Sequence, residues 1–255
     1  MRRILKYVVL DIVKNKFVLF FSIILALFAF TTFSLEDNTA KGLLTMLNIV
    51  QMVVPLVAIL FSTTYIYNSS EFIELLVSQP IKRSKIWWSL FLGLSLSLSM
   101  AFIIGVGLAL FIFVAWSKAL VMLVSGILLT TIFVAIAFVS AVFTRDKAKG
   151  IGLSIFLWLY FAVLFDGFLL MLVYQFSDYP IEKMMVGVTT LNPIDLARVL
   201  ILLQLDVSAM MGYTGAVFKN FFGTNMGMAL SLLVLLLWAL VPFWISLKKF
   251  KTKDL

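Results

Sequence analysis

Residues 69–85 read SSEFIELLVSQPIKRSK and separate two long apolar runs of the chain. Ser69 or Ser70 can cap a helix, glutamates are favoured in its first turn, and Pro80 ends it. The stretch is too polar to cross a bilayer, and three basic residues follow it: Lys82, Arg83 and Lys85. It therefore predicts a short helix over 70–80 that lies at a membrane surface between two spans, beside anionic headgroups.

The predicted helix has two unlike faces. One face groups the polar side chains of Glu71, Glu74 and Ser78. The other face carries Phe72, Leu75, Leu76 and Gln79. From these residues alone, two interpretations stay open: a solvated loop that happens to be helical, or an element that docks on a partner. If the helix docks, we expect its acidic face and its ends to meet the partner, while the leucines pack under the spans.

The whole chain is strongly apolar. Hydrophobic residues make up 63% of its 255 residues, charged residues make up 13%, and the mean hydropathy is +1.14. Soluble domains carry about 25% charged residues. With no linker and no repeat, 1–255 is predicted to be a single all-α integral membrane domain. Its six candidate spans, each close to the roughly 20 residues that a bilayer requires, are 17–33, 42–66, 86–116, 119–143, 151–174 and 226–247.

The basic residues predict the orientation. With the N-terminus inside, fifteen of the twenty Lys and Arg residues fall in cytoplasmic segments and five fall outside. Basic residues concentrate on the cytoplasmic side of membrane proteins, so we expect both termini in the cytoplasm. The same rule explains the net charge of +8 by membrane topology and not by nucleic-acid binding.

Two segments outside the spans are predicted to be ordered. Residues 1–16 mix basic and apolar side chains and are too charged to span, which predicts a helix lying at the cytoplasmic interface. The outer connection over 175–225 is about fifty residues long, and loops of that length without a function are uncommon. Its apolar stretch 197–205 is too short to span, so we predict re-entrant or surface-lying helices there.

Missing residue types exclude several chemistries. The chain has no cysteine and no histidine, which removes disulfides, thiol nucleophiles, zinc thiolate sites and imidazole bases. No glycine is followed by lysine, so no phosphate-binding loop for ATP is present. The twelve methionines lack a repeated spacing and are interpreted as packing, not as copper ligands. We therefore predict no catalytic residue, no metal site and no cofactor bound by this chain.

Asp166 is the one charged residue inside a predicted span. An unpaired carboxylate at that depth costs about 3 kcal/mol or more, so the side chain should face protein or water. It could contact a proton, an ion or a substrate, or it could form a hydrogen bond that ties helices together. A weaker polar grouping lies in the second span, at Asn48, Gln51 and Pro55.

The outer connection contains one ordered-looking motif, TTLNPIDLARVL at 189–200. Asn192 and Pro193 break the chain, and Asp195 begins an apolar helix with Arg198 three residues later. These four residues are compatible with a capped surface helix or with a contact site for an external partner.

Together these features resemble the type-2 ABC exporter permeases. The shared features are six spans, a basic amphipathic N-terminal helix, a short helix between spans two and three, and a long connection before span six. A narrower resemblance is to the NosY-type permeases, which serve the maturation of nitrous oxide reductase. It rests on LLVSQPIKRSKI (75–86), VLFDGFLLMLV (163–173) and LNPIDLARVLIL (191–202) followed by SAMMG (208–212). Glu71 and Phe72 depart from the small residues of NosY-type chains.

The resemblance implies a division of labour between subunits. A separate NosF-like ATPase dimer would hold ATP and Mg, while this chain would be a non-catalytic subunit of a bacterial inner membrane, paired with a second copy of itself and surrounded by lipid. The ATPase would dock on Glu71, Phe72, Glu74, Leu75, Ser78, Pro80, Lys82 and Arg83. A NosD-like periplasmic protein would be held by the long outer connection, where Asn192, Pro193, Asp195 and Arg198 are the candidate contacts.

The implied function is mechanical. ATP-driven motion would pass through the spans to the periplasmic partner and support assembly of the copper–sulfur centre of the reductase. Two alternatives remain open: a permease that exports a lipid, a peptide or an antibiotic, and a carrier of ions or protons built around Asp166.

Overall fold

The computed structural model describes residues 2–36, 38–176, 182–204 and 225–252, and in these ranges it contains helices and no strand. Part of the predicted outer connection, including SAMMG at 208–212, lies outside the described residues. In chain order the helices are α1 (Arg2–Val13), α2 (Lys16–Leu35), α3 (Thr39–Asn68), α4 (Ser70–Ser78), α5 (Arg83–Phe102), η1 (Ile103–Gly107), α6 (Leu108–Phe113), α7 (Trp116–Phe143), α8 (Lys147–Leu159), η2 (Tyr160–Leu164), α9 (Phe165–Gln175), α10 (Glu182–Thr189), α11 (Pro193–Gln204) and α13 (Asn225–Thr252).

Six helical segments are long and apolar enough to cross a membrane, as predicted. They are Lys16–Leu35, Thr39–Asn68, Arg83–Phe113, Trp116–Phe143, Lys147–Gln175 and Gly227–Thr252. The third joins α5, η1 and α6, and the fifth joins α8, η2 and α9. Both η segments are single π-helical turns, which insert an extra residue into a helix and bend it. The chain is therefore a multi-pass, all-helical membrane protein.

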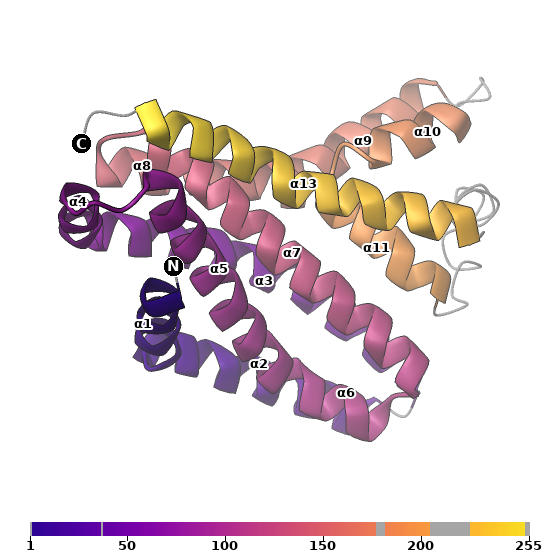
Figure 1. Ribbon diagram of the computed structural model, residues 1–255. Coiled ribbons are helices and arrows are strands. Elements are labelled where there is room, and N and C mark those ends of the chain that lie inside the picture. Colours follow the sequence, from indigo (N-terminus) through magenta and orange to yellow (C-terminus); the bar gives the residue numbers. More distant parts are fainter. Residues whose placement is uncertain (1, 37, 177–181, 205–224, 253–255) are drawn as a thin grey trace.

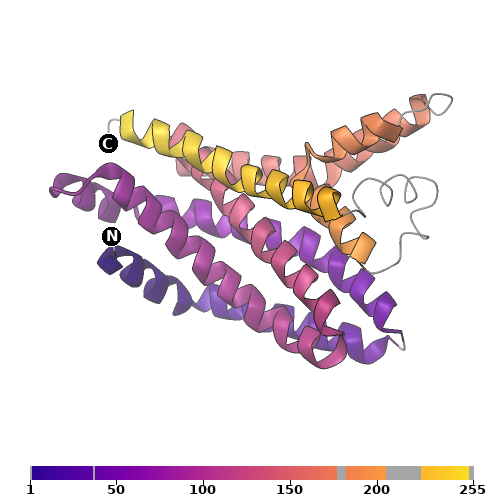
Figure 2. The same ribbon diagram turned by 45° about the vertical axis from the view of Figure 1, so that its right-hand side comes forward.

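The spans run side by side between two ends of the molecule. Both termini, α1 and α4 lie at one end (Figures 1 and 2). We call this the basic end, because it carries the cations that flank the spans: Lys82, Arg83, Lys85, Arg145, Lys147, Lys149, Lys248, Lys249 and Lys251. The turns from α2 to α3 and from α6 to α7 lie at the opposite end (Figure 1).

The fourth span, α7, is the centre of the bundle. It packs against α3, α5, α11 and α13, and 67% of its most apolar window is buried inside the chain. Gly126 permits a close contact, since a Cβ atom there would clash with the Phe102 ring of α5. Small residues let helix backbones approach in this way where apolar packing replaces the hydrophobic effect.

The N-terminal helix α1 packs on α5. Val8 and Ile12 are fully buried, and Gly93 of α5 leaves room for Val8, whose Cγ1 would lie 2.4 Å from a Cβ at that glycine. The opposite face exposes Lys6 and Tyr7, so the predicted amphipathic helix is present. Its location at a cytoplasmic membrane surface stays a prediction.

The fifth span leaves the bundle halfway along its length. Its first part, α8, packs on α3 and α7, and only 11% of the apolar window of the whole span is buried. Beyond η2, α9 diverges from the other spans and is accompanied by α10 (Figures 1 and 2). The space beside it is occupied by α11, which contacts α3, α7, α13 and η2.

Candidate functional site

The predicted docking helix is present as α4, directly after α3, with only Ser69 between them. Ile73 and Leu76 are buried against the bundle, while Glu71 and Glu74 are exposed. Ser78, also exposed, donates a hydrogen bond to the Leu75 carbonyl at 2.9 Å in the last turn. The helix therefore rests on an apolar face and presents an acidic one, as the spacing predicted.

One residue of the predicted faces is misplaced. The side chain of Leu75 was expected under the spans with Leu76, but it is 65% exposed and lies among the glutamates. Ile73, which the two-face pattern did not include, takes the inward position and is 4% exposed. The reason is the helical spacing: α4 packs along positions 73 and 76, and at about 100° per residue position 75 falls about 130° away from the centre of that pair.

The surroundings of α4 fix its position at the basic end. The Phe72 ring, partly buried, lies 5.4 Å from the Tyr7 ring of α1. After the exposed Pro80, Lys82 caps α5, and Arg83 donates a hydrogen bond from Nη1 to the Lys251 carbonyl of α13 at 3.2 Å. Residues from α1 and α13 thus hold both flanks of the α4 segment.

A second polar cluster lies inside the molecule and centres on Arg198 of α11. Its Nε donates to the Gln51 Oε1 of α3 at 2.9 Å, and its Nη1 lies 3.1 Å from Asp166 Oδ2 of α9 and 3.4 Å from Asp195 Oδ1. Gln51 and Asp195 are buried, whereas about one third of each of the Arg198 and Asp166 side chains is exposed. One guanidinium therefore joins the second span, the fifth span and α11.

Asn192 anchors the start of α11 to the bend in the fifth span. In η2, the Phe165 N–H bonds to the Tyr160 carbonyl instead of the Phe161 carbonyl four residues back. Asn192, fully buried, donates from Nδ2 to that Phe161 oxygen at 2.8 Å, while its Oδ1 accepts from the Ile194 N–H at 3.0 Å. One amide side chain thus satisfies the carbonyl left free by the bend and a backbone N–H in the first turn of α11.

The turn between α10 and α11 lies deep between the spans. Phe161 is at the middle of the fifth span, and Trp238, near the middle of α13, donates from Nε1 to the Thr190 carbonyl at 3.1 Å. The geometry is that of a helical hairpin entering from the opposite end and turning at mid-depth. Of the two predicted arrangements, re-entrant and surface-lying, it corresponds to the re-entrant one.

The cluster holds more negative than positive charge. Asp166 and Asp195 share the single guanidinium of Arg198. Asp195 is buried, lies 3.4 Å from the Arg198 guanidinium, and accepts a hydrogen bond from Asn192 at 2.8 Å. Gln51 Nε2 is buried without a hydrogen-bond partner among the described residues. The cluster is thus closely coupled and incompletely satisfied.

The structure brings together residues that are far apart in the sequence. Asp166 forms a contact between helices, with Arg198, which matches one of its two predicted roles. Asn192 and Asp195 are buried, so a partner could meet this segment only through exposed neighbours such as Leu191. The contributions of Trp238 and of the Phe161 carbonyl were missed, since neither an indole nor a backbone oxygen stands out in an apolar run. Within the described residues, no group of three carboxylates could hold a metal ion.

Comparison with known proteins identifies the family. The sequence profile described as "ABC-2 family transporter protein" matches residues 15–255, nearly the whole chain. No curated protein matches the sequence.

Replacing Arg198 by Gln should destabilise the protein, because it leaves two carboxylates without their cation. We expect a loss of about 1–3 kcal/mol, towards the lower value because the pair with Asp166 is partly exposed. The measurement is the melting temperature of the purified chain in mild detergent. Adding Asp166→Asn to Arg198→Gln should recover part of the loss, since it removes one stranded charge.

Lys118→Gln, a change of the same charge at the opposite end, is the matched control and should leave the melting temperature unchanged. Equal melting temperatures for Arg198→Gln and for the double variant would show that Asp166 is not balanced by Arg198.

Proposed function

We propose, from the premise that the chain belongs to the ABC-2 family of transporter membrane proteins, that it couples a separate cytoplasmic ATPase to a periplasmic partner in nitrous oxide reductase maturation. Membership makes the chain a membrane permease of an ABC transporter, whose general kind of partner is an ATPase. The observation that carries the coupling role is α4, which lies between the second and third spans with Glu71, Glu74 and Leu75 exposed. ATP and Mg would belong to the ATPase.

The contacts of α4 suggest how force would enter the permease. An ATPase that binds Leu75 between the two glutamates would grip an apolar anchor rimmed by charge, the usual composition of an interface centre. Ile73 and Leu76 seat the helix on the bundle, so a displacement of α4 acts on α3 and α5, its neighbours in the chain. The docking residues would lie on the cytoplasmic side, as the distribution of basic residues predicts.

The third helix offers a physical route across the membrane. α3 continues into α4 at the basic end, and its Gln51 accepts a hydrogen bond from Arg198 of the hairpin. A shift of α3 would therefore pull on α11, which leads into the outer connection. Coupling of this kind requires an element with two arrangements that both sites bias. We assign that part to the hairpin, which is seated against α9 by Arg198 and against η2 by Asn192.

A periplasmic, NosD-like partner would bind the outer connection. The side chains of Asn192 and Asp195 are buried and hydrogen-bonded to each other. They would therefore support partner binding indirectly, by holding the hairpin in shape. An exposed apolar residue of α10, Met184, is available for such a contact. The assignment to nitrous oxide reductase maturation rests on the NosY-type stretches and extends beyond the family match.

A second copy of the chain would cover the fifth span. That span is the least buried, and its exposed side carries the partly exposed Asp166–Arg198 pair. A charge facing hydrocarbon is costly, so this surface should meet protein or a water-filled space instead of lipid. Because Asp166 is held by Arg198, a carrier built on a free carboxylate at this position is disfavoured.

Co-expression with the neighbouring genes tests the central proposal. A tagged chain purified in mild detergent should retain an ATPase subunit and a NosD-like protein, both identified by mass spectrometry. An ATPase without a NosD-like protein would favour the alternative of a lipid, peptide or antibiotic exporter. Retention of neither subunit would refute the coupling role.

Charge reversal on α4 tests the docking surface. Replacing Glu71 and Glu74 together by Lys should abolish the ATP hydrolysis stimulated by the permease, because like charges oppose approach of a partner that fits an acidic face. Leu75→Ala should reduce the stimulation by about tenfold, the effect of losing roughly 1.4 kcal/mol at an interface anchor. The measurement is the hydrolysis rate of the purified complex.

Glu36→Lys, at the opposite end, is the control and should leave hydrolysis unchanged. The melting temperature of each variant shows that the permease is folded. Normal stimulation in the Glu71 and Glu74 double variant would exclude a docking role for the acidic face.

Cysteine cross-linking tests the second copy, since the chain has no native cysteine. We place single cysteines at Tyr160, Val163 and Phe168 of the fifth span, one in each variant. The variant whose cysteine lies nearest the two-fold axis is expected to give covalent dimers in membranes. Trp244→Cys on α13, 69% exposed, is the control and should remain monomeric. Dimers from Trp244→Cys alone would place the interface on the sixth span.

A further inference from the structure

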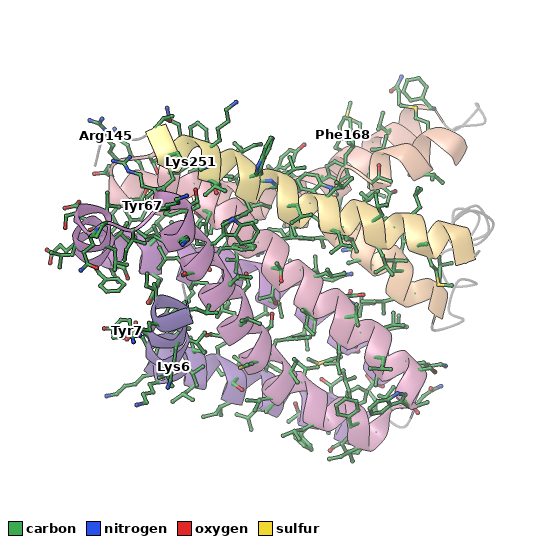
Figure 3. The ribbon with its side chains drawn as sticks, in the orientation of Figure 1. Lys6, Tyr7, Tyr67, Arg145, Phe168 and Lys251 are labelled. Atoms are coloured by element: carbon green, nitrogen blue, oxygen red, sulfur yellow. The ribbon has the colours of Figure 1, made fainter. Side chains whose placement is uncertain are left out.

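A cavity of about 330 Å³ lies at the basic end of the bundle. Its walls come from the end of α3, from α4, from the start of α5, from the end of α7 and the turn after it, and from the end of α13. Tyr67, Arg145 and Lys251 mark this region in Figure 3. The volume is within the range of small-molecule sites, about 300–1,000 Å³.

The lining divides into an apolar floor and a polar mouth. The floor consists of buried side chains: Ile66, Ile73, Trp87, Ala141, Val142 and Phe250. The mouth consists of exposed or partly exposed polar residues: Tyr67, Ser70, Glu74, Thr144 and Arg145. Such a cavity suits an amphiphile whose polar part stays at the surface.

The mouth carries one positive and one negative side chain, and neither of them pairs with another described residue. The side chains of Arg145 and Glu74 have no hydrogen bond or ion pair with any of the described residues, although both line the same cavity. Tyr67, in contrast, donates to the Thr144 carbonyl at 3.2 Å and closes one wall. A simple anion would be repelled by Glu74 and a simple cation by Arg145, so the two charges together fit a ligand that is a zwitterion.

The depth of the cavity corresponds to the headgroup region of a bilayer. It lies where the third span begins, at Trp87 and Trp88, and where the sixth span ends, at Lys249 and Lys251. Tryptophan and basic residues gather at the membrane–water interface, and pockets between spans at this level bind lipid headgroups. Arginine recognises phosphate through two parallel hydrogen bonds, and a carboxylate accepts from an ammonium group.

We propose that this cavity binds the headgroup of an ethanolamine phospholipid, with the phosphate at Arg145, the amine at Glu74 and the adjoining apolar part on the floor. The bound headgroup bridges α4, which carries Glu74, and the turn after α7, which carries Arg145. Glu74 and Arg145 form no ion pair with each other in the described part of the chain. The headgroup therefore ties α4 to the turn after α7 at the mouth of the cavity. The proposal concerns the permease alone and needs no ATPase.

Melting of the purified full-length chain in mild detergent, with added lipid, tests the site. Phosphatidylethanolamine at about ten times its dissociation constant should raise the melting temperature by roughly 3–6 °C. Phosphatidylglycerol and phosphatidylcholine at the same concentration should raise it less, because one lacks the amine and the other blocks it with methyl groups. Arg145→Gln should abolish the response to phosphatidylethanolamine, and Glu74→Gln should abolish its advantage over phosphatidylglycerol.

Lys41→Gln and Glu36→Gln, at the opposite end, are matched controls and should respond as the unmodified chain does. An unchanged response of Arg145→Gln, or an equal response of the unmodified chain to all three lipids, overturns the proposal. Free phosphoethanolamine that reproduces the full shift would identify a water-soluble ligand and also overturn it. None of these measurements involves ATP hydrolysis, so their failure is distinguishable from failure of the docking role of α4.

Discussion

The guanidinium of Arg198 is the contact on which the outer half of the molecule depends. A hairpin that turns at mid-depth introduces charges and backbone groups where water cannot satisfy them. The Arg198 guanidinium contacts three side-chain oxygens at once: those of Gln51 on α3, of Asp166 on α9 and of Asp195 on its own helix. Asn192 and Trp238 then occupy the two carbonyls exposed by the bend in the fifth span and by the turn of the hairpin. These polar contacts act together with apolar packing, since α11 also buries a row of apolar side chains against α7 and α13: Ile194, Leu196, Ala197, Val199, Leu200 and Ile201.

At the basic end, the described residues include no ion pair that accompanies the apolar packing. There, apolar packing seats the elements: Trp87 stacks on Phe250 at 4.1 Å, and Ile73 and Leu76 press α4 against the bundle. Polar side chains remain at the surface, where Glu71, Leu75 and the basic residues are available to a partner. A firmly packed base that carries an exposed helix suits an element that must transmit force without unfolding. α3 joins the two halves, since it leads into α4 at one end and carries Gln51 at its middle.

Several features of the fold follow from one-dimensional patterns. Six apolar runs predict six spans because an apolar helix of about twenty residues has no stable alternative in a bilayer. The polar stretch at 69–85 predicts a short helix because capping residues and Pro80 bound it. Leu75 shows the limit of the same pattern. Two faces of a nine-residue helix can be identified from spacing, but a rotation by one position decides which leucine is buried.

Hydropathy and local capping were enough to predict the fold class, the number of spans, the amphipathic helix α1 and the short helix α4. The sequence also singled out Asp166 as a charge inside a span, and Asp195 and Arg198 as part of the motif at 189–200. Only the tertiary structure decided that these three form one cluster with Gln51, that the hairpin turns inside the bundle, and that Arg145 and Glu74 share a cavity. The physical reason is distance along the chain: Arg198 is 147 residues from Gln51 and 32 from Asp166. No local rule of helix formation relates residues so far apart, and their meeting depends on how the spans pack.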